Sequence, residues 1–412
     1  MLRNIVYNFR SFVDRHWIMP ISLDSGKTHT DVPAVSNCNA TLSHRPLRAC
    51  STYVRPTQGF GSRMLRLLLS ACVTAGTAVA PIPSFPPHLV GNATAVYGLL
   101  ERVLPGSSAH FELAIAPQAA SHGGKNAFTI SDVAGDRTRI TGTTASELTG
   151  GLGVYLREHC GMTVGWVRGG GSRVFTPKAW PKVGAAPVTR ARSVPYSHVT
   201  QVCTHSYTLV WHDWAEWERF IDWMALAGHN SIVAPTGQEE IQHRVLTKHF
   251  GVSDMAVRNW TNGPAWLTWS RGQNSHGNGV GGPLPRSFQM DQWALQKQIL
   301  ARYRSLGIAG HLPAFGGYAP WALAVAQNAT HRIAQGKGAA IDTAWIDGRD
   351  ELYTAVANKW AEEIVADFGS DHVWQMDAVS NFRHRPLVLA EFQARLFRSP
   401  AACCLPPLPP EL

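Results

Sequence analysis

Two adjacent glutamates, Glu239 and Glu240, follow a β-branched run and are the first candidates for acid–base chemistry. A pair of carboxyl groups can act across a scissile glycosidic bond when the two lie about 5–5.5 Å apart and configuration is retained. Neighbouring glutamates also favour the first turn of a helix, where their charge complements the helix dipole. We weigh three roles for this pair: helix N-terminus first, contact with a bound ligand second, and catalysis last.

Other reactive side chains offer weaker signals. Asp377 closes a strand-like run and is predicted to hold a neighbouring group by hydrogen bonding, whereas Asp371 is typical of a turn. Cys203 and His205 resemble a thiol–imidazole pair, but no orienting Asp or Asn is evident, so a packed or pocket-lining cysteine is favoured. The scattered histidines lack the i, i+4 pair with an intervening glutamate that zinc hydrolases use. The sequence therefore predicts neither a metal site nor a cofactor.

The chain is rich in tryptophan, with fifteen in 412 residues, and many lie among polar neighbours. Sugars present apolar C–H faces that aromatic rings cover, so this composition favours a carbohydrate site. The alternative is that most of these rings belong to the core, and the Trp-rich stretch 211–223 is predicted to be mainly core.

Charge is uneven along the chain, whose net charge is +9. Residues 1–66 hold nine Lys or Arg against three Asp, and residues 381–412 hold four Arg against two Glu, so the body is close to neutral. No basic run there interleaves with aromatics, which argues against nucleic acid as a partner. Only Cys160 and Cys203 of the seven cysteines lie in the body, so no disulfide framework is predicted.

Residues 90–185 predict a small α/β domain. Apolar spacing over 96–104 indicates a helix, and β-branched or alternating runs follow at 111–116, 127–131 and 138–142. A second helix is predicted from Thr144 to Glu158, with Gly161 placed to end it. Gly151 and Gly153 do not complete a dinucleotide-binding fingerprint, and that function is rejected. The Gly- and Pro-rich stretch up to Pro187 is predicted to be a linker.

Strands and helices alternate over residues 195–378. The predicted strands are 199–203, 230–234, 308–315 and 372–377, and helical spacing recurs over 214–228, 288–303 and 352–368. Such alternation indicates parallel strands with crossover helices, hence a doubly wound sheet or a (β/α)₈ barrel. In both folds the function lies at the carboxyl ends of the strands.

The segment 64–80 resembles a signal peptide, with a short basic start, an apolar centre and a small-x-small end at Ala78-Val-Ala80. It is too short for a membrane span, which needs roughly 20 residues. Its alternative is a buried helix. Residues 1–63 are predicted to be a spurious or disordered extension, with Met64 as the true start. Entry into the secretory pathway, to a lysosome, a vacuole or the exterior, is expected, and four Asn-x-Ser/Thr sequons agree with it: Asn39, Asn92, Asn259 and Asn328.

One long motif resembles a known family. Residues 202–230, VCTHSYTLVWHDWAEWERFIDWMALAGHN, are similar to the start of the barrel in the α-N-acetylglucosaminidases, lysosomal or secreted glycosidases that remove terminal α-linked N-acetylglucosamine, notably from heparan sulphate. Shorter similar stretches occur at 155–161, 237–239, 263–269, 282–285, 312–315 and 368–372. The resemblance covers about residues 90–378.

The resemblance implies an N-terminal α/β domain, a (β/α)₈ TIM barrel of which this chain holds the first half, and a two-carboxylate retaining mechanism without metal. The family's general acid is a glutamate in an Asp-x-x-Asn-Glu segment. Here Asp377 starts that segment, but Ser380 and Asn381 stand where Asn-Glu is expected. The second glutamate, the nucleophile, has no counterpart, and residues 380–412 are predicted to be a disordered tail unlike the family. We expect an inactive chain.

The resemblance also assigns pocket residues. Gln201 stands where the family has a sugar-contacting asparagine, and Cys203, Tyr207 and Trp269 match positions that line the sugar pocket. With Glu239 and Asp377, these are the predicted substrate-binding residues, and the predicted partner is a glycan ending in α-N-acetylglucosamine. A non-catalytic sugar-binding remnant and an unrelated α/β hydrolase with Cys203 as nucleophile stay as alternatives.

Overall fold

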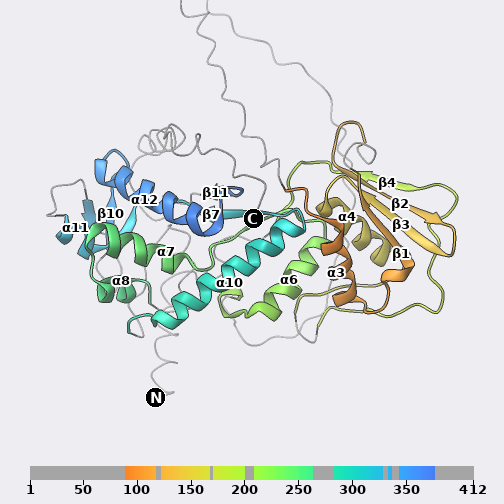
Figure 1. The fold of residues 1–412 in the computed structure, drawn as a ribbon, viewed down its shortest axis with the longest axis horizontal. Helices are drawn as coiled ribbons and strands as arrows, with labels where there is room; N and C mark the ends of the chain where they lie inside the picture. Colours follow the sequence, from red (N-terminus) through yellow and green to blue (C-terminus); the bar gives the residue numbers. More distant parts are fainter. Residues whose placement is uncertain are drawn as a thin grey trace, which may run out of the picture. The chain divides into compact units, whose positions relative to one another are not determined.

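The computed structural model describes residues 89–116, 122–167, 170–199, 208–262, 282–327, 333–335 and 343–375. The predictions for 1–63, 64–80 and 380–412 lie outside these ranges. Helices and strands alternate through the described part, as Figure 1 shows.

The first sheet contains four strands in the order β1-β3-β2-β4. β1 (Phe111–Ile115) and β3 (Arg137–Gly142) are parallel, while β2 (Ala127–Val133) runs antiparallel to β3 and β4 (Val188–Ala191). The three predicted runs are confirmed as strands. β4 lies beyond residue 185, so the sheet closes only after the Pro-rich stretch has returned the chain to it.

Two helices pack against this sheet. α3 (Ala93–Val103) begins at Asn92, whose side chain accepts a hydrogen bond from the Ala95 backbone N–H. α4 (Ala145–Val154) continues into a π-helical turn over Tyr155–His159, and Gly161 follows at φ 64°. The predicted helix and its glycine stop are therefore confirmed, because a left-handed residue at that point ends the helix with little strain.

The second sheet is entirely parallel, in the order β11-β7-β6-β5. Its strands are β5 (His198–Val199), β6 (Ser231–Val233), β7 (Ala309–Pro313) and β11 (Val373–Gln375). Each falls within or beside a predicted strand, and their parallel pairing confirms the crossover architecture expected from the alternation.

Helices connect these parallel strands. α6 (Trp214–Leu226) joins β5 to β6 after a 3₁₀ turn at Leu209–Trp211. Between β6 and β7 lie α7 (Gln238–Arg244), a π-helical turn (Val245–His249), α8 (Asp254–Trp260) and α10 (Arg286–Ser305). α12 (Glu351–Phe368) leads into β11. In Figure 1, α6 and α10 lie side by side on the sheet.

A small antiparallel sheet interrupts the connection from β7 to α12. It consists of β8 (Tyr318–Pro320), β10 (Thr343–Ile346) and β9 (Ile333–Gln335), with α11 (Trp321–Ala326) following β8. Sequence periodicity missed it, because strands of three or four residues are too short to display alternation.

The tryptophans of the 211–223 stretch divide between core and surface. Trp217 is buried, with 1% of its surface exposed, but Trp211 is 58% exposed in the 3₁₀ turn before α6. Trp214 and Trp223 are half-buried. The prediction of a mainly buried stretch is therefore wrong for Trp211, which precedes the helix and does not share its buried face.

The first domain packs on α6 through glycines of α4. A Cβ atom on Gly153 would lie 1.8 Å from the Leu226 carbonyl oxygen, and one on Gly151 would lie 2.9 Å from Ile140 Cγ2. These glycines allow α4 to approach α6 on one side and the first sheet on the other. Arg157 extends the contact by donating to the Leu226 carbonyl at 2.8 Å. The large hydrophobic cluster then includes residues of both parts, from Val96 to Phe368.

We expect Gly153→Ala to lower the free energy of unfolding by roughly 1–3 kcal/mol, since the new methyl group overlaps the Leu226 carbonyl. Gly150→Ala is the matched control, because its Cβ would meet Gly228 Cα at an ordinary 3.6 Å and alanine favours a helix. Urea unfolding followed by circular dichroism measures both. Equal effects at the two positions would contradict the close-contact explanation.

Candidate carbohydrate site at the carboxyl ends of the parallel strands

Buried side chains from the helices bind the backbone carbonyls at the carboxyl ends of β6 and β7. Gln296 of α10 donates to the Ala234 carbonyl at 2.7 Å, and Trp360 of α12 donates to the Pro313 carbonyl at 2.9 Å. Tyr353 donates to the Phe315 carbonyl at 2.5 Å, and burial raises the pKa of this phenol, which keeps its proton available. The ends of the strands are therefore fixed by α10 and α12.

The segment after β6 is buried and sharply turned. Gly237 adopts φ 75°, and a Cβ there would lie 2.8 Å from Trp293 Cα and 3.0 Å from the Gln292 carbonyl oxygen. Only glycine fits this approach to α10. It directs the chain into α7, whose first residues Gln238, Glu239 and Glu240 are all buried.

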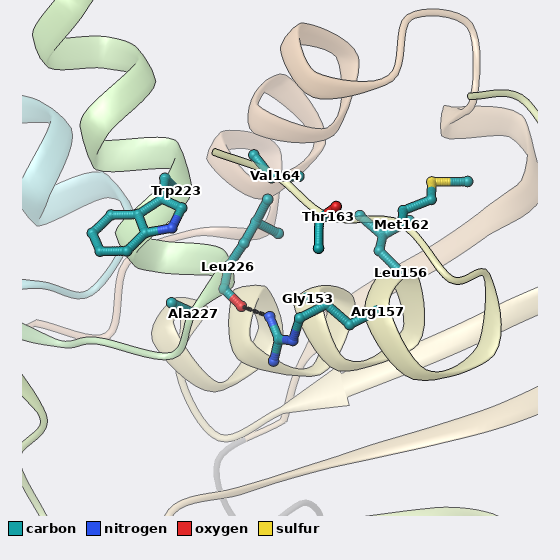
Figure 2. Close-up of a pocket in the computed structure, with 9 residues that line it drawn as sticks. All are labelled: Gly153, Leu156, Arg157, Met162, Thr163, Val164, Trp223, Leu226 and Ala227. Carbon is teal, nitrogen blue, oxygen red and sulfur yellow. Dashed lines mark hydrogen bonds between the residues drawn. The ribbon is translucent and has the colours of Figure 1, made fainter. Parts of the chain in front are cut away.

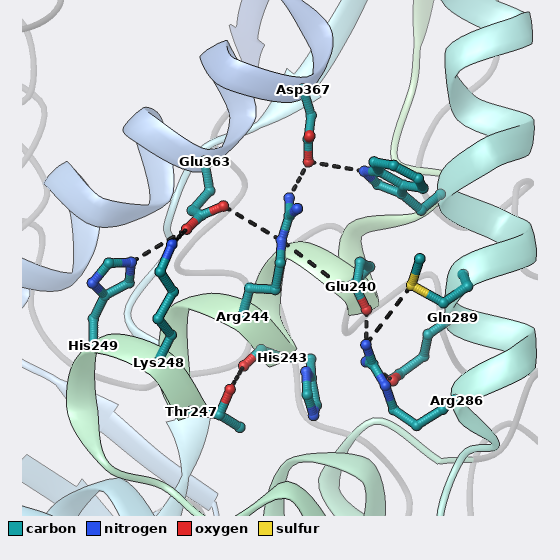
Figure 3. Close-up of polar contacts among 12 residues, drawn as sticks. Glu240, His243, Arg244, Thr247, Lys248, His249, Arg286, Gln289, Glu363 and Asp367 are labelled. Atoms are coloured by element: carbon teal, nitrogen blue, oxygen red, sulfur yellow. Dashed lines mark hydrogen bonds and ion pairs between the residues drawn. The ribbon is translucent and has the colours of Figure 1, made fainter.

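Glu240 belongs to a charge network between α7, α10 and α12 (Figure 3). It accepts a 2.6 Å hydrogen bond from Arg286 and lies 3.8 Å from Arg244. Arg244 is also paired with Glu363 at 3.4 Å and with Asp367. Because both of its charged neighbours are arginines, Glu240 serves to join helices.

Glu363 illustrates the electrostatics of this network. Burial works to raise the pKa of its carboxyl, but the hydrogen bond with His249 and the charges of Arg244 and Lys248 outweigh burial, so its pKa lies below the ordinary value. Asp367 accepts from the Trp293 indole N–H at 2.8 Å. Figure 3 shows these acids directed at cations of neighbouring helices, which leaves them neutralised.

Three polar side chains, His198, Ser231 and His311, form a hydrogen-bonded row on the parallel sheet, on the face that points away from α10. His198 Nδ1 lies 2.8 Å from Ser231 Oγ, and His311 Nε2 lies 2.7 Å from the same oxygen. Gly310 faces α10, since a Cβ there would lie 2.9 Å from Leu300 Cδ2, so His311 faces the other side, which a closed barrel turns inward. Burial, together with the charge of His198, lowers the pKa of His311 to about 4.

Of the predicted site residues, Glu239 is the one that the structure describes. It lies in the first turn of α7 and is fully buried, which agrees with the helix N-terminus favoured for this pair. The others lie outside the described residues: Gln201, Cys203, Tyr207, Trp269, Asp377 and Asn381. Sequence reasoning passed over the buried amides Gln238, Gln289 and Gln296, and the only signal was the Gly-Gln-Glu stretch at 237–239.

The described residues contain a pocket far from these strand ends. It measures about 300 Å³ and lies where α4 and its π-helical turn meet the end of α6 (Figure 2); its lining includes Arg157, Met162, Trp223 and Leu226. Because α6 runs back from β5 to the start of β6, its last residues lie at the amino ends of the strands. The pocket is therefore at the opposite end from the candidate site.

Within the described ranges, no group of three or more His, Cys, Asp or Glu side chains could hold a metal ion. None of the helices described there is long and apolar enough to cross a membrane.

The parallel strands are joined by helices and have a buried polar segment at their carboxyl ends. This arrangement classifies the fold as part of a (β/α)₈ barrel that carries a small α/β domain. Residues 197–398 match the "Alpha-N-acetylglucosaminidase (NAGLU) tim-barrel domain" and residues 94–182 match the N-terminal domain of the same family. The chain therefore belongs to the α-N-acetylglucosaminidase family, as its motifs predicted. The alternative of an unrelated α/β hydrolase is excluded.

Two relatives support this assignment. Human alpha-N-acetylglucosaminidase is 33% identical over 298 residues, which make up 71% of this chain and 39% of the human protein. A family 89 glycoside hydrolase from Clostridium perfringens, solved with 2-acetamido-1,2-dideoxynojirmycin, is 25% identical with a TM-score of 0.63 and covers 69% of this chain and 32% of that one. The chain thus spans about two fifths of the curated relative's length.

Two further structures from Clostridium perfringens share the fold. The family 89 hydrolase solved with PUGNAc has a TM-score of 0.67 at 22% identity, covering 83% of this chain and 39% of that one. The one described as in complex with its substrate GlcNAc-alpha-1,4-galactose has a TM-score of 0.63 at 24% identity, covering 76% and 34%.

A pH dependence of stability follows from the buried His372. Burial lowers its pKa to about 4 despite the nearby Asp371 carboxylate, so the folded protein keeps the imidazole neutral where an unfolded one, with a pKa of about 6.5, takes up a proton. The contribution of the neutral His372 to the free energy of unfolding is fully present above about pH 6.5 and is lost as the pH falls toward 4. We expect His372→Gln to narrow the difference in free energy of unfolding between pH 7 and pH 4.5, by roughly 1–3 kcal/mol.

The exposed His122, which bridges to Lys125, provides the control, His122→Gln, in the same urea titrations at both pH values. An unchanged pH difference in the His372 variant would show that this imidazole is not held neutral by burial.

Proposed function

We propose that this chain binds terminal α-linked N-acetylglucosamine at the carboxyl ends of its parallel strands and does not cleave the glycosidic bond. The match of residues 197–398 to the family's barrel domain carries the first half of this proposal. The relative described in complex with GlcNAc-alpha-1,4-galactose supports this sugar as ligand. Gln201, Cys203, Tyr207, Trp269, Glu239 and Asp377 are the binding residues that we propose from the family resemblance.

The absence of cleavage is proposed from the chemistry of the replaced acid. Retaining hydrolysis needs one carboxylic acid to protonate the leaving oxygen and a second carboxylate to attack the anomeric carbon. Asn381 stands at the acid position, and a carboxamide cannot give up a proton to a leaving alkoxide near neutral pH. Glu240 is not proposed to replace it, because this carboxylate is paired with Arg286 and Arg244.

For the longer relatives, whose length this chain covers only in part, the corresponding proposal is removal of terminal α-N-acetylglucosamine from glycans such as heparan sulphate by a two-carboxylate mechanism without metal. A transcript that encodes an Asn-Glu pair at 380–381 would transfer that activity to this gene product.

We expect binding without turnover. Saturation-transfer NMR with the full chain should detect methyl α-N-acetylglucosaminide but not methyl α-glucoside, and p-nitrophenyl α-N-acetylglucosaminide should release no nitrophenolate above the blank. The methyl glucoside tests whether the acetamido group is recognised. Release of nitrophenolate in proportion to protein concentration would overturn the non-catalytic half, and equal signals for both sugars would overturn the assigned specificity.

We further propose that the chain enters the secretory pathway. The segment 64–80 supports this, as do the sequons at Asn92 and Asn259. Expression in a secreting eukaryotic cell should give a product whose N-terminus is Pro81 and whose mass falls on treatment with an N-glycosidase. A product that stays in the cell with residues 64–80 attached would contradict this.

A further inference from the structure

Three fully buried glutamines lie in α7 and α10, the two helices that follow β6. Gln238 begins α7, while Gln289 and Gln296 project from α10, and each has 0% of its surface exposed. Gln238 follows Gly237, which touches α10 at Gln292 and Trp293. Buried amides at such a density are unusual, because a carboxamide in the interior is stable only when its hydrogen bonds are made.

The two glutamines of α10 have visible structural roles. Gln296 donates to the Ala234 carbonyl at 2.7 Å, and Gln289 accepts from Arg286 at 2.5 Å. Each therefore has one atom bonded to protein and one atom, Gln296 Oε1 or Gln289 Nε2, without a partner.

Gln238 differs from both. Neither its Oε1 nor its Nε2 has a hydrogen-bond partner, although the side chain is fully buried. Removing an amide from water without replacing its hydrogen bonds opposes folding, so an apolar residue would serve the packing better. A buried polar side chain that makes no hydrogen bond within the fold needs another explanation, and a functional position is one.

The position of Gln238 is also fixed. The left-handed Gly237 packs closely against Trp293 of α10, and Gln296 of the same helix binds the Ala234 carbonyl at the end of β6. A ligand group that meets the Gln238 amide would therefore meet it in one orientation, which is what discrimination between similar ligands requires.

The chemistry of the free amide selects the ligand class. A carboxamide offers one acceptor and two donors and carries no charge. It can bind two neighbouring neutral groups when one of them accepts a hydrogen bond and the other donates one. Adjacent hydroxyl or acetamido substituents on a sugar ring are such groups. An anionic ligand would instead favour arginine, and the nearby Arg286 and Arg244 are already paired with Glu240.

We propose that Gln238 is a sugar-binding residue, whose Nε2 donates to one substituent of the bound sugar ring and whose Oε1 accepts from a neighbouring one. This inference rests on the proposed function and adds to it a residue that neither the motifs nor the family resemblance assigned. The bound sugar then forms hydrogen bonds with Gln238 Nε2 and Oε1, which have no partner within the protein.

The test pairs stability with binding in the full chain. Gln238→Met keeps the length of the side chain and removes its polar atoms. We expect its midpoint of urea unfolding to equal or exceed that of the unchanged protein, while its Kd for methyl α-N-acetylglucosaminide, from NMR titration, rises at least about tenfold. Gln296→Met is the matched control: the same exchange breaks the bond to Ala234, so the unfolding midpoint should fall.

Two results would overturn the inference. If Gln238→Met binds the sugar as tightly as the unchanged chain, Gln238 holds only a buried water. If Gln238→Met loses stability as Gln296→Met does, Gln238 is a structural residue. Gln238→Leu, read by the same two measurements, must agree with the Met variant. If the unchanged chain itself fails to bind the sugar, the proposed function fails and takes this inference with it.

Discussion

Backbone carbonyls at the carboxyl ends of the parallel strands must find hydrogen-bond donors, and the architecture around the candidate site depends on how they do so. Strands that end inside the protein leave carbonyl groups that water cannot reach. Here Gln296, Trp360 and Tyr353 supply the donors from α10 and α12. The same bonds that satisfy the strand ends therefore fix two helices on the sheet, and the helices in turn fix the segment from Gly237 onward.

The acidic residues near the site are committed to this scaffold. Glu240, Glu363 and Asp367 each face a cation from another helix. These ion pairs hold the three carboxylates between helices, and for Glu363 the hydrogen bond with His249 and the charges of Arg244 and Lys248 outweigh burial and keep its pKa below the ordinary value. Acids and amides thus divide between two tasks: the acids join helices, and the amide of Gln238 is left with its hydrogen-bonding capacity free.

The attachment of the small domain depends on a steric constraint at the other end of the strands. α4 reaches the last turn of α6 because Gly153 has no side chain, and Arg157 and Arg102 then add polar contacts to Leu226 and Asp222. The pair Gly151 and Gly153, which taken alone resembles part of a dinucleotide-binding loop, is therefore explained by the packing of α4. The pocket at this junction lies away from the chemistry expected at the carboxyl ends.

Local patterns in the sequence were enough to predict the elements and their class. The helices at 214–226, 286–305 and 351–368 follow from apolar spacing, the strands follow from β-branched runs, and the motif at 202–230 indicated the family that the domain matches later established. These patterns involve residues only a few positions apart, so they can be recognised in the sequence without knowledge of the tertiary structure. The tertiary structure alone decided that Glu240 pairs with Arg286, that Gly153 fits against Leu226, that a short antiparallel sheet follows β7, and that Gln238 is buried without a partner. Those outcomes depend on neighbours brought together from distant parts of the chain, and no periodicity or spacing along the sequence records which neighbours they will be.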